Sequence, residues 1–358
     1  MQALVTQPGV AGSTGVEEVP DPRAAAQEVL LRTLEVGVCG TDREISDGHF
    51  GIAPGDGGRL VLGHEFLGVV ERDAHGLRRG DLVTATVRRG CGHCPACAEE
   101  SPDACDTGDY VERGITRLHG FASELVAEAA DQLIPIPPAL GRLGVLAEPA
   151  SICARGLRHA RTIGTRQPWS PRHALVLGPG AIGMLATYML RLDGIETWTV
   201  GRSTGGEKAE LVAAAGATYV ASSETPLEDL RTETGGFDIV VEAAGDAQLM
   251  LAALGLLRRN GVACLLGIDG RERAVSIDGH VLGVDAILEN RVLFGSVNAH
   301  RTDWRAAVEA LDAARARWPG ALERFVGLRV PLDRYADAFG FRGVKATLQI
   351  APEGPAAA

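Results

Sequence analysis

The arrangement of apolar residues along the chain changes near residue 173. Up to about residue 158, apolar residues form short β-branched runs between Gly/Pro turns, such as Arg59-Leu60-Val61-Leu62-Gly63 and Gly68-Val69-Val70. Such runs predict a compact, mostly β domain. From about residue 173, short apolar strands alternate with stretches of helical length and periodicity. This alternation is typical of a doubly wound parallel sheet, so the sequence predicts an α/β protein with two different domains.

The second region and the tail contain the elements that can be placed best. We expect strands at His173–Leu177, Glu196–Val200, Phe237–Glu242, Val262–Gly267 and Val292–Val297. We expect helices at Ala181–Leu192, Glu207–Ala215, Ala247–Arg259 and Ala286–Arg291. In the tail, a helix at Thr302–Arg317 precedes two strands, Val326–Pro331 and Lys345–Ile350, which could rejoin the first domain. The expected domains are therefore 1–158, 159–298 and a returning segment at 299–358.

Length and charge limit the classes of function. A chain of 358 residues suits two hydrophobic cores better than one. Its formal net charge is −11, and an acidic surface repels phosphate backbones and anionic lipids. The N-terminus lacks the pattern of a secretory signal, and glycines and a proline interrupt the longest apolar run, Ala174–Leu190. We therefore expect a cytoplasmic protein with no nucleic-acid partner and no membrane partner.

Four cysteines form the strongest local motif. Cys91, Cys94 and Cys97 follow one another at three-residue spacing, and Cys105 comes after seven further residues. Four thiolates can close a tetrahedral site without an open position, which is how structural zinc is held. Four ordinary reduced thiols are the alternative, and an iron–sulfur run is disfavoured because no Pro follows the fourth Cys. His93 lies inside the loop and could compete as a ligand.

A glycine motif at the start of the second region predicts nucleotide binding. Gly178-x-Gly180-x-x-Gly183 lies between an expected strand and an expected helix, with Ala181 and Ile182 as the intervening residues. The first Gly permits a tight turn, the second lets the backbone approach a pyrophosphate, and the third lets helix pack on strand. Amides at the helix N-terminus then face the anion. In this context the motif predicts a Rossmann domain.

The end of the next strand favours NADP over NAD. An NAD-binding fold carries an Asp or Glu about 20 residues beyond the glycine motif, where it binds the ribose hydroxyls. Here the strand runs into Gly201, Arg202, Ser203 and Thr204, which offer space, a guanidinium and two hydroxyls for a 2′-phosphate. Lys208 could add positive charge. Arg202 could instead be a solvated loop residue, and use of NAD stays possible.

A dispersed set of residues could form a second metal site. Cys39 offers a thiolate, Thr41 a hydroxyl, His64 an imidazole, and Glu65 and Glu148 carboxylates. A lone Cys or His in an apolar stretch is more often a packed core residue than a ligand. The order and context of the set nevertheless match the catalytic-zinc pattern of medium-chain dehydrogenases.

The chain resembles the glucose (aldose) 1-dehydrogenases of the zinc-dependent medium-chain family. The segments that carry this resemblance are Val38–Ile45, Leu62–Glu71, Glu112–Ile115, His119–Phe121 and Gly295–Asn298. It implies a GroES-like catalytic domain beside the Rossmann domain. It also implies catalytic zinc on Cys39 and His64, with Glu65 and Glu148 as alternating or water-bridged ligands, although either carboxylate could instead support a ligand.

The resemblance implies roles for further residues. Thr41 would pass a proton outward, and Glu112 and Asn298 match positions that contact sugar or nicotinamide. Glu112 could instead make a surface salt bridge with a neighbouring Arg, and Asn298 could cap the helix near Thr302. The implied reaction is oxidation of an aldose at C1 to a lactone, with two zinc ions per chain, NADP, and a homodimer or homotetramer.

Two departures from the family leave the substrate open. Glu44 stands where many zinc alcohol dehydrogenases have a relay His, and Ala150-Ser151-Ile152-Cys153 replaces the usual aliphatic residues. Another polyol, a cyclitol or an amino sugar could therefore be the substrate. A nucleotide-binding sensor that has lost the chemistry is a third possibility, but a sensor would not need an open zinc site.

Overall fold

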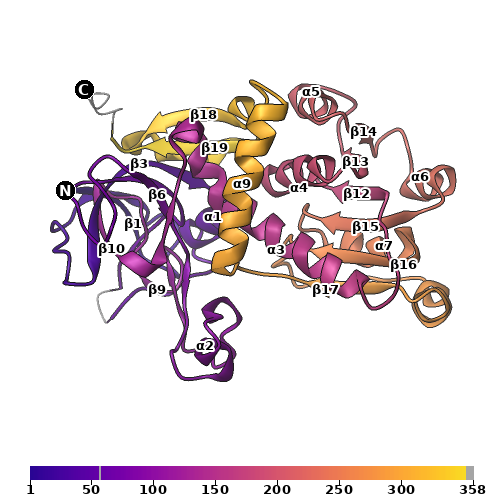
Figure 1. Ribbon diagram of the computed structural model, residues 1–358, viewed down its shortest axis with the longest axis horizontal. Helices are drawn as coiled ribbons and strands as arrows, with labels where there is room; N and C mark the ends of the chain where they lie inside the picture. The colour runs from indigo at the N-terminus through magenta and orange to yellow at the C-terminus, as the bar shows by residue number, and fades with distance from the viewer. Residues whose placement is uncertain (56–57, 352–358) are drawn as a thin grey trace. The chain divides into compact units, whose positions relative to one another are not determined.

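The computed structural model describes residues 1–55 and 58–351, which form two compact units (Figure 1). The first unit contains Met1–Glu148, Asn298–Asp312 and the segment that begins at Val326. The second contains Pro149–Val297 and Ala313–Phe325. The end of the predicted returning segment, 352–358, lies outside the described residues.

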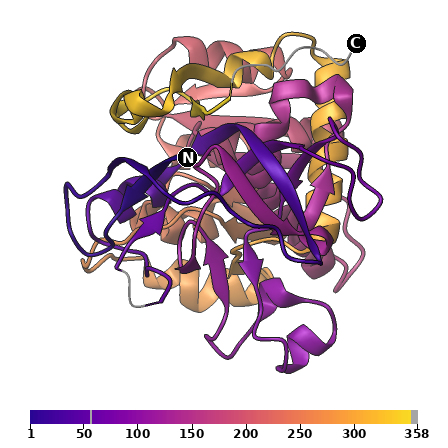
Figure 2. The same cartoon turned by 90° about the vertical axis from the view of Figure 1, so that its left-hand side faces the viewer.

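The first unit is mostly β. Its strands are β1 (Gln2–Thr6), β2 (Gly15–Glu18), β3 (Glu28–Val38), β4 (Leu60–Val61), β5 (Glu65–Val70), β6 (Leu82–Ala85), β7 (Arg88–Arg89), β8 (Val111–Arg113), β9 (Arg117–Leu118), β10 (Leu125–Ala129), β11 (Leu133–Pro135), β18 (Val326–Pro331) and β19 (Lys345–Gln349). Its helices are α1 (Gly40–Ser46), α2 (Pro95–Ala98), α10 (Tyr335–Gly340) and the beginning of α9 (Arg301–Arg317). Short 3₁₀ turns include η3 (Pro138–Leu146). The segment that contains α2 extends away from the strands of this unit (Figures 1 and 2).

Strand β3 organises the largest sheet of the first unit. The strand order is β11-β6-β5-β3-β19-β18, and β10 also pairs with β3. The tail strands β18 and β19 thus extend the sheet that the N-terminal strands begin. β5 and β19 flank the C-terminal end of β3, where Gly37 pairs with Glu65 on one side and with Thr347 on the other. Residues that are distant in sequence are therefore close at this end of β3.

The second unit is a parallel sheet with helices. Its strands are β12 (His173–Leu177), β13 (Glu196–Gly201), β14 (Thr218–Ala221), β15 (Phe237–Glu242), β16 (Leu257–Leu265) and β17 (Val292–Gly295). Its helices are α3 (Ala147–Gly164), α4 (Ala181–Leu192), α5 (Glu207–Ala214), α6 (Leu227–Thr234), α7 (Ala247–Leu256) and α8 (Ala286–Leu288), which the π-helix η4 (Val281–Asp285) precedes. The strand order β14-β13-β12-β15-β16-β17 reverses direction at β12, as in doubly wound sheets. The predicted fold class is confirmed.

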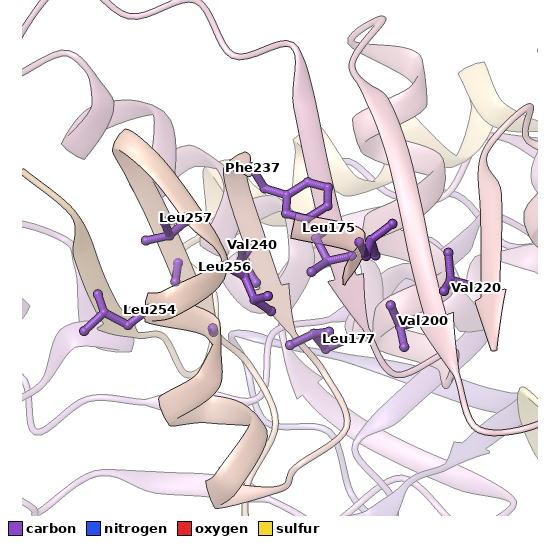
Figure 3. Close-up of a cluster of buried hydrophobic side chains, with 12 residues drawn as sticks. Leu175, Leu177, Val200, Val220, Phe237, Val240, Leu254, Leu256 and Leu257 are labelled. Carbon is purple, nitrogen blue, oxygen red and sulfur yellow. The ribbon is translucent and has the colours of Figure 1, made fainter. Parts of the chain in front are cut away.

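The core of this sheet explains why its strands read as continuous apolar runs. Leu175, Val240 and Phe237 are buried on the sheet and pack with Leu254 and Leu256 of α7 (Figure 3). Every residue of β15 is buried, because helices cover both faces of a parallel sheet.

Several expected elements have other bounds in the structure, and the strand expected at Val262–Gly267 is β16, which begins at Leu257 and ends at Leu265. The helix expected at Ala247–Arg259 ends at Leu256, and Leu257 already pairs with Phe237 in the sheet. Pairing with β15 therefore outweighs the helical periodicity of these leucines. The helix expected at Ala286–Arg291 is only the short α8, and β17 ends at Gly295 rather than Val297. Among the described residues, no helix is long and apolar enough to cross a membrane.

Candidate catalytic and cofactor sites

Cys39 and His64 meet where β3 ends and β5 begins. Cys39 caps α1 directly after β3, and its Sγ lies 3.1 Å from Nε2 of His64. Ligand atoms of Cys39, His64 and Glu65 all lie within 4.8 Å of one another. The antiparallel pairing of β3 with β5 produces this proximity, and the Cys/His/carboxylate set is one that zinc binds in catalytic sites.

Asp42 supports this pair, and the sequence analysis did not single it out. Its Oδ2 accepts a hydrogen bond from the Cys39 amide at 2.9 Å, and its Oδ1 lies 3.4 Å from Nδ1 of His64. Burial would raise the pKa of Asp42, but the charge of His64 and the hydrogen bond from the Cys39 amide lower it. A carboxylate behind an imidazole fixes the tautomer and orientation of a metal-binding His. The sequence signal that could have identified Asp42 is an acidic residue at the third helical position after Cys39.

Lys345 is the second group that the sequence analysis missed. Its Nζ donates to both carboxylate oxygens of Glu65, each at 2.6 Å, and to the carbonyl of Val38 at 3.2 Å. The Glu65 side chain is 2% exposed and that of Lys345 is 3% exposed. Burial would lower the pKa of Lys345, but Glu65 and Cys39 outweigh it and raise the pKa. Gly37 makes room for the pair, because a Cβ there would overlap the Glu65 carboxylate.

Glu148 is buried in the first turn of α3, near the same residues. It is not part of the group whose ligand atoms all lie within 4.8 Å. Burial raises the pKa of Glu148 to about 7. The charge of His64 opposes this shift, and the charge of Glu65 adds to it. The structure therefore gives the two carboxylates different surroundings.

Thr41, Glu112 and Asn298 complete the predicted catalytic and substrate residues. The Thr41 amide donates to Sγ of Cys39 at 3.2 Å, which places this residue at the start of α1 beside the thiol. Glu112 is buried, and its Oε1 accepts from Nδ2 of Asn298 at 2.8 Å and from Nε of Arg88 at 3.0 Å. Glu112 thus makes a buried ion pair instead of a surface one. The side-chain oxygen of Asn298 accepts a hydrogen bond from the Ala299 amide. At the start of α9, the His300 amide donates its hydrogen bond to Asp303 instead.

The four cysteines of the first unit form a second metal-binding group. Ligand atoms of Cys91, Cys94, Cys97 and Cys105 lie within 4.8 Å of one another, and all four thiols are free. Sγ of Cys105 lies 3.4 Å from Oγ1 of Thr107, and this hydrogen bond together with backbone amides lowers the pKa of Cys105, which favours a thiolate. His93 is exposed, and its Nδ1 lies 3.0 Å from the Cys91 carbonyl. Four sulfur donors fit a closed zinc site.

The glycine motif of the second unit forms the turn that the sequence predicts. Gly178 has a φ of +100°, and a Cβ on Gly183 would overlap the Gly178 carbonyl. Gly180 is the N-cap of α4, so Ala181, Ile182 and Gly183 form the first helical turn. The N-terminus of α4 therefore offers free amides to an anion at the point where strand order reverses.

The loop after β13 carries exposed polar residues. Gly201 is the last residue of β13, and Arg202 and Ser203 are exposed in the loop that follows. Burial, and then the nearby charge of Arg202, lowers the pKa of Lys208. The positive charges of Arg202 and Lys208 therefore repel each other in this structure.

Comparisons with known proteins show relatives along the whole chain. The family model of the alcohol dehydrogenase GroES-like domain matches residues 25–138, and that of the glucose dehydrogenase C-terminus matches residues 141–350. A glucose 1-dehydrogenase of Methanocella arvoryzae is 41% identical, over 99% of this chain and 99% of that protein. One of Thermoproteus tenax is 37% identical, over 98% and 99%.

A solved structure is similar over the same length. It is the glucose dehydrogenase of Haloferax mediterranei in complex with NADP, zinc and gluconolactone, which matches with a TM-score of 0.90 and 33% identity. The match covers 98% of this chain and 100% of that one. With the two family models and relatives of this identity across its length, the chain belongs to the glucose 1-dehydrogenase family of zinc-dependent medium-chain dehydrogenases.

Proposed function

We propose that this protein oxidises an aldose, with glucose as the first candidate, at C1 to the lactone and transfers hydride to NADP. The observation that carries the proposal is the convergence of Cys39, His64 and a carboxylate in the first unit. The family relationship supports the substrate, since the relatives are glucose 1-dehydrogenases and one was solved with NADP, zinc and gluconolactone.

The proposed chemistry assigns a task to each residue. Zinc supplies Lewis acidity that lowers the pKa of a hydroxyl group. Cys39 and His64 would hold the ion, and Asp42 would orient the His64 ring. Thr41 takes the proton outward, while Glu112 and Asn298 bind sugar or nicotinamide.

We propose that Glu65 and Glu148 serve as alternating or water-bridged ligands. Lys345 donates to both carboxylate oxygens of Glu65. Because both oxygens are directed to this ammonium group, the contact supports Glu65 as a ligand that binds zinc only part of the time. The four cysteines would hold a second, structural zinc ion, giving two ions per chain.

The cofactor residues proposed are those of the α4 N-terminus and the loop after β13. Gly178, Gly180, Ala181, Ile182 and Gly183 would bind the pyrophosphate. Gly201, Arg202 and Ser203 would accept the 2′-phosphate, with Asn298 at the nicotinamide end.

A panel of sugars and polyols tests the function. Purified enzyme with zinc is mixed with NADP or NAD, and the absorbance of the reduced cofactor is followed. We expect glucose, galactose or a close aldose to be oxidised, with formation of the lactone. Turnover of cyclitols or other polyols but no aldose would replace this proposal by the polyol alternative, and no turnover with any substrate would favour a sensor.

We also propose that the protein forms a homodimer or homotetramer. β17 is an edge strand of its sheet. Large exposed apolar residues lie in this strand (Leu293) and next to it in sequence (Ile287, Leu288 and Val297). Such a surface is typical of an association site. Light scattering after gel filtration measures the assembly, and a monomer at micromolar concentration would contradict it. The cytoplasmic location stays a prediction.

A further inference from the structure

Tyr219 contacts the loop after β13, which is one of the two proposed cofactor segments of the second unit. It lies on β14, which pairs with β13, and its hydroxyl donates to the Ser203 carbonyl at 2.8 Å. The Oγ of Ser203 is also 3.5 Å from this hydroxyl. Tyr219 therefore fixes the backbone of the exposed loop that carries Arg202.

Gly201 shows that the tyrosine fills a particular place. A Cβ on Gly201 would overlap the Tyr219 hydroxyl, and it would lie 2.9 Å from Cγ of Pro179. Pro179 belongs to the glycine motif, so the Tyr219 hydroxyl and the pyrophosphate turn both lie next to Gly201. A residue with a side chain at position 201 would fit only if the Tyr219 ring moved and its hydroxyl lost the hydrogen bond to Ser203.

This arrangement bears on the choice of cofactor. In NAD-binding folds, a carboxylate near the end of the second strand binds the ribose hydroxyls and repels a 2′-phosphate. In this chain the Tyr219 hydroxyl occupies the space that the Cβ of such a carboxylate residue would need at position 201. The same hydroxyl orders a loop that bears the guanidinium of Arg202, with Lys208 near enough for their charges to interact.

We propose that Tyr219 is a positioning residue that determines the preference for a 2′-phosphorylated cofactor. It acts in two ways: it excludes a carboxylate at position 201, and it holds the Ser203 carbonyl so that the Arg202 segment faces the phosphate. The inference rests on the proposed use of NADP.

The first test measures binding without turnover. Calorimetry compares 2′,5′-ADP with 5′-AMP on wild type and on Tyr219→Phe, which keeps the ring and removes the hydroxyl. We expect 2′,5′-ADP to bind about two- to tenfold more weakly to the variant, the range of one hydrogen bond, with 5′-AMP unchanged. In kinetics the KM for NADP should rise while kcat stays near that of wild type. Tyr335→Phe is the matched control, since its hydroxyl also donates to a backbone carbonyl, that of Thr14 in the first unit.

A second test addresses exclusion at position 201. Gly201→Asp alone should lose 2′,5′-ADP without gaining NAD affinity, because the new side chain meets Tyr219. Gly201→Asp with Tyr219→Ala should gain NAD affinity relative to the single variant. Equal NAD affinity in both would overturn the exclusion argument.

The outcomes separate this inference from the function on which it rests. If wild type does not prefer 2′,5′-ADP over 5′-AMP, the proposed NADP use fails and the role of Tyr219 fails with it. If wild type prefers 2′,5′-ADP and Tyr219→Phe keeps the same ratio, only the role of Tyr219 is overturned.

Discussion

Replacing Lys345 by Met should destabilise the first unit strongly, because it leaves the Glu65 carboxylate buried without a cation. Glu65 is 2% exposed, and both of its oxygens bond to Nζ of Lys345. Removing one partner of a buried ion pair costs about 3–5 kcal/mol. The third bond of the ammonium group, to the Val38 carbonyl, adds about 1 kcal/mol. We therefore expect a loss of roughly 5 kcal/mol in the free energy of unfolding.

A double variant tests the reason for this loss. Lys345→Met with Glu65→Gln removes both charges, so it should be more stable than Lys345→Met alone. Urea unfolding, followed by far-UV circular dichroism on zinc-replete and chelated protein, measures both variants. The zinc content of the folded fraction shows whether Lys345 also supports the metal site. A loss below about 1 kcal/mol, or a double variant no more stable than the single one, would refute the buried-pair argument.

Three further predictions concern the other sites. Cys94→Ser should lower the melting temperature and reduce zinc from about two ions per chain to about one, because structural zinc contributes folding free energy; unchanged zinc content by elemental analysis would contradict a four-thiolate site. Arg202→Ala should weaken NADP about tenfold or more and leave NAD nearly unchanged, as expected for one charge-assisted contact; equal losses in both specificity constants would make Arg202 a solvated residue. Asn298→Ala should raise the KM for the sugar or cofactor with little change in melting temperature; a fall in stability with unchanged kinetics would give the contact with Glu112 a structural role only.

The sequence predicted those parts of the molecule that depend on local pattern. Strands β12 and β15 and helix α4 have the expected bounds, because apolar runs and glycines mark their ends. Helix α7 was predicted too long, since Leu256 and Leu257 continue its apolar stretch and neither Gly nor Pro occurs between Gly255 and Gly261. Only the pairing of Leu257 with Phe237 ends this helix, and such a contact has no local signal.

The same distinction applies to the metal site of the first unit. Cys39 and His64 could be found because each lies in a motif of the family. Lys345 could not be found, since its approach to Glu65 depends on the order β5-β3-β19 in the sheet. The apolar alternation of β19 specifies a strand, but it does not specify which strand will be its neighbour.

This sheet order also explains how the site carries its charge. The site holds three buried carboxyl groups, Asp42, Glu65 and Glu148, next to the half-buried Cys39, and a buried charge without a partner is strongly unfavourable. Lys345 offsets one of them through β19, and a divalent ion bound by Cys39 and His64 would offset two more. Burial raises the pKa of Glu148 to about 7, so this group can take up a proton near neutral pH. The strand from the far end of the chain is therefore part of the electrostatics of the site, and a metal-binding fragment that ends before β19 would lack the cation that its carboxylates need.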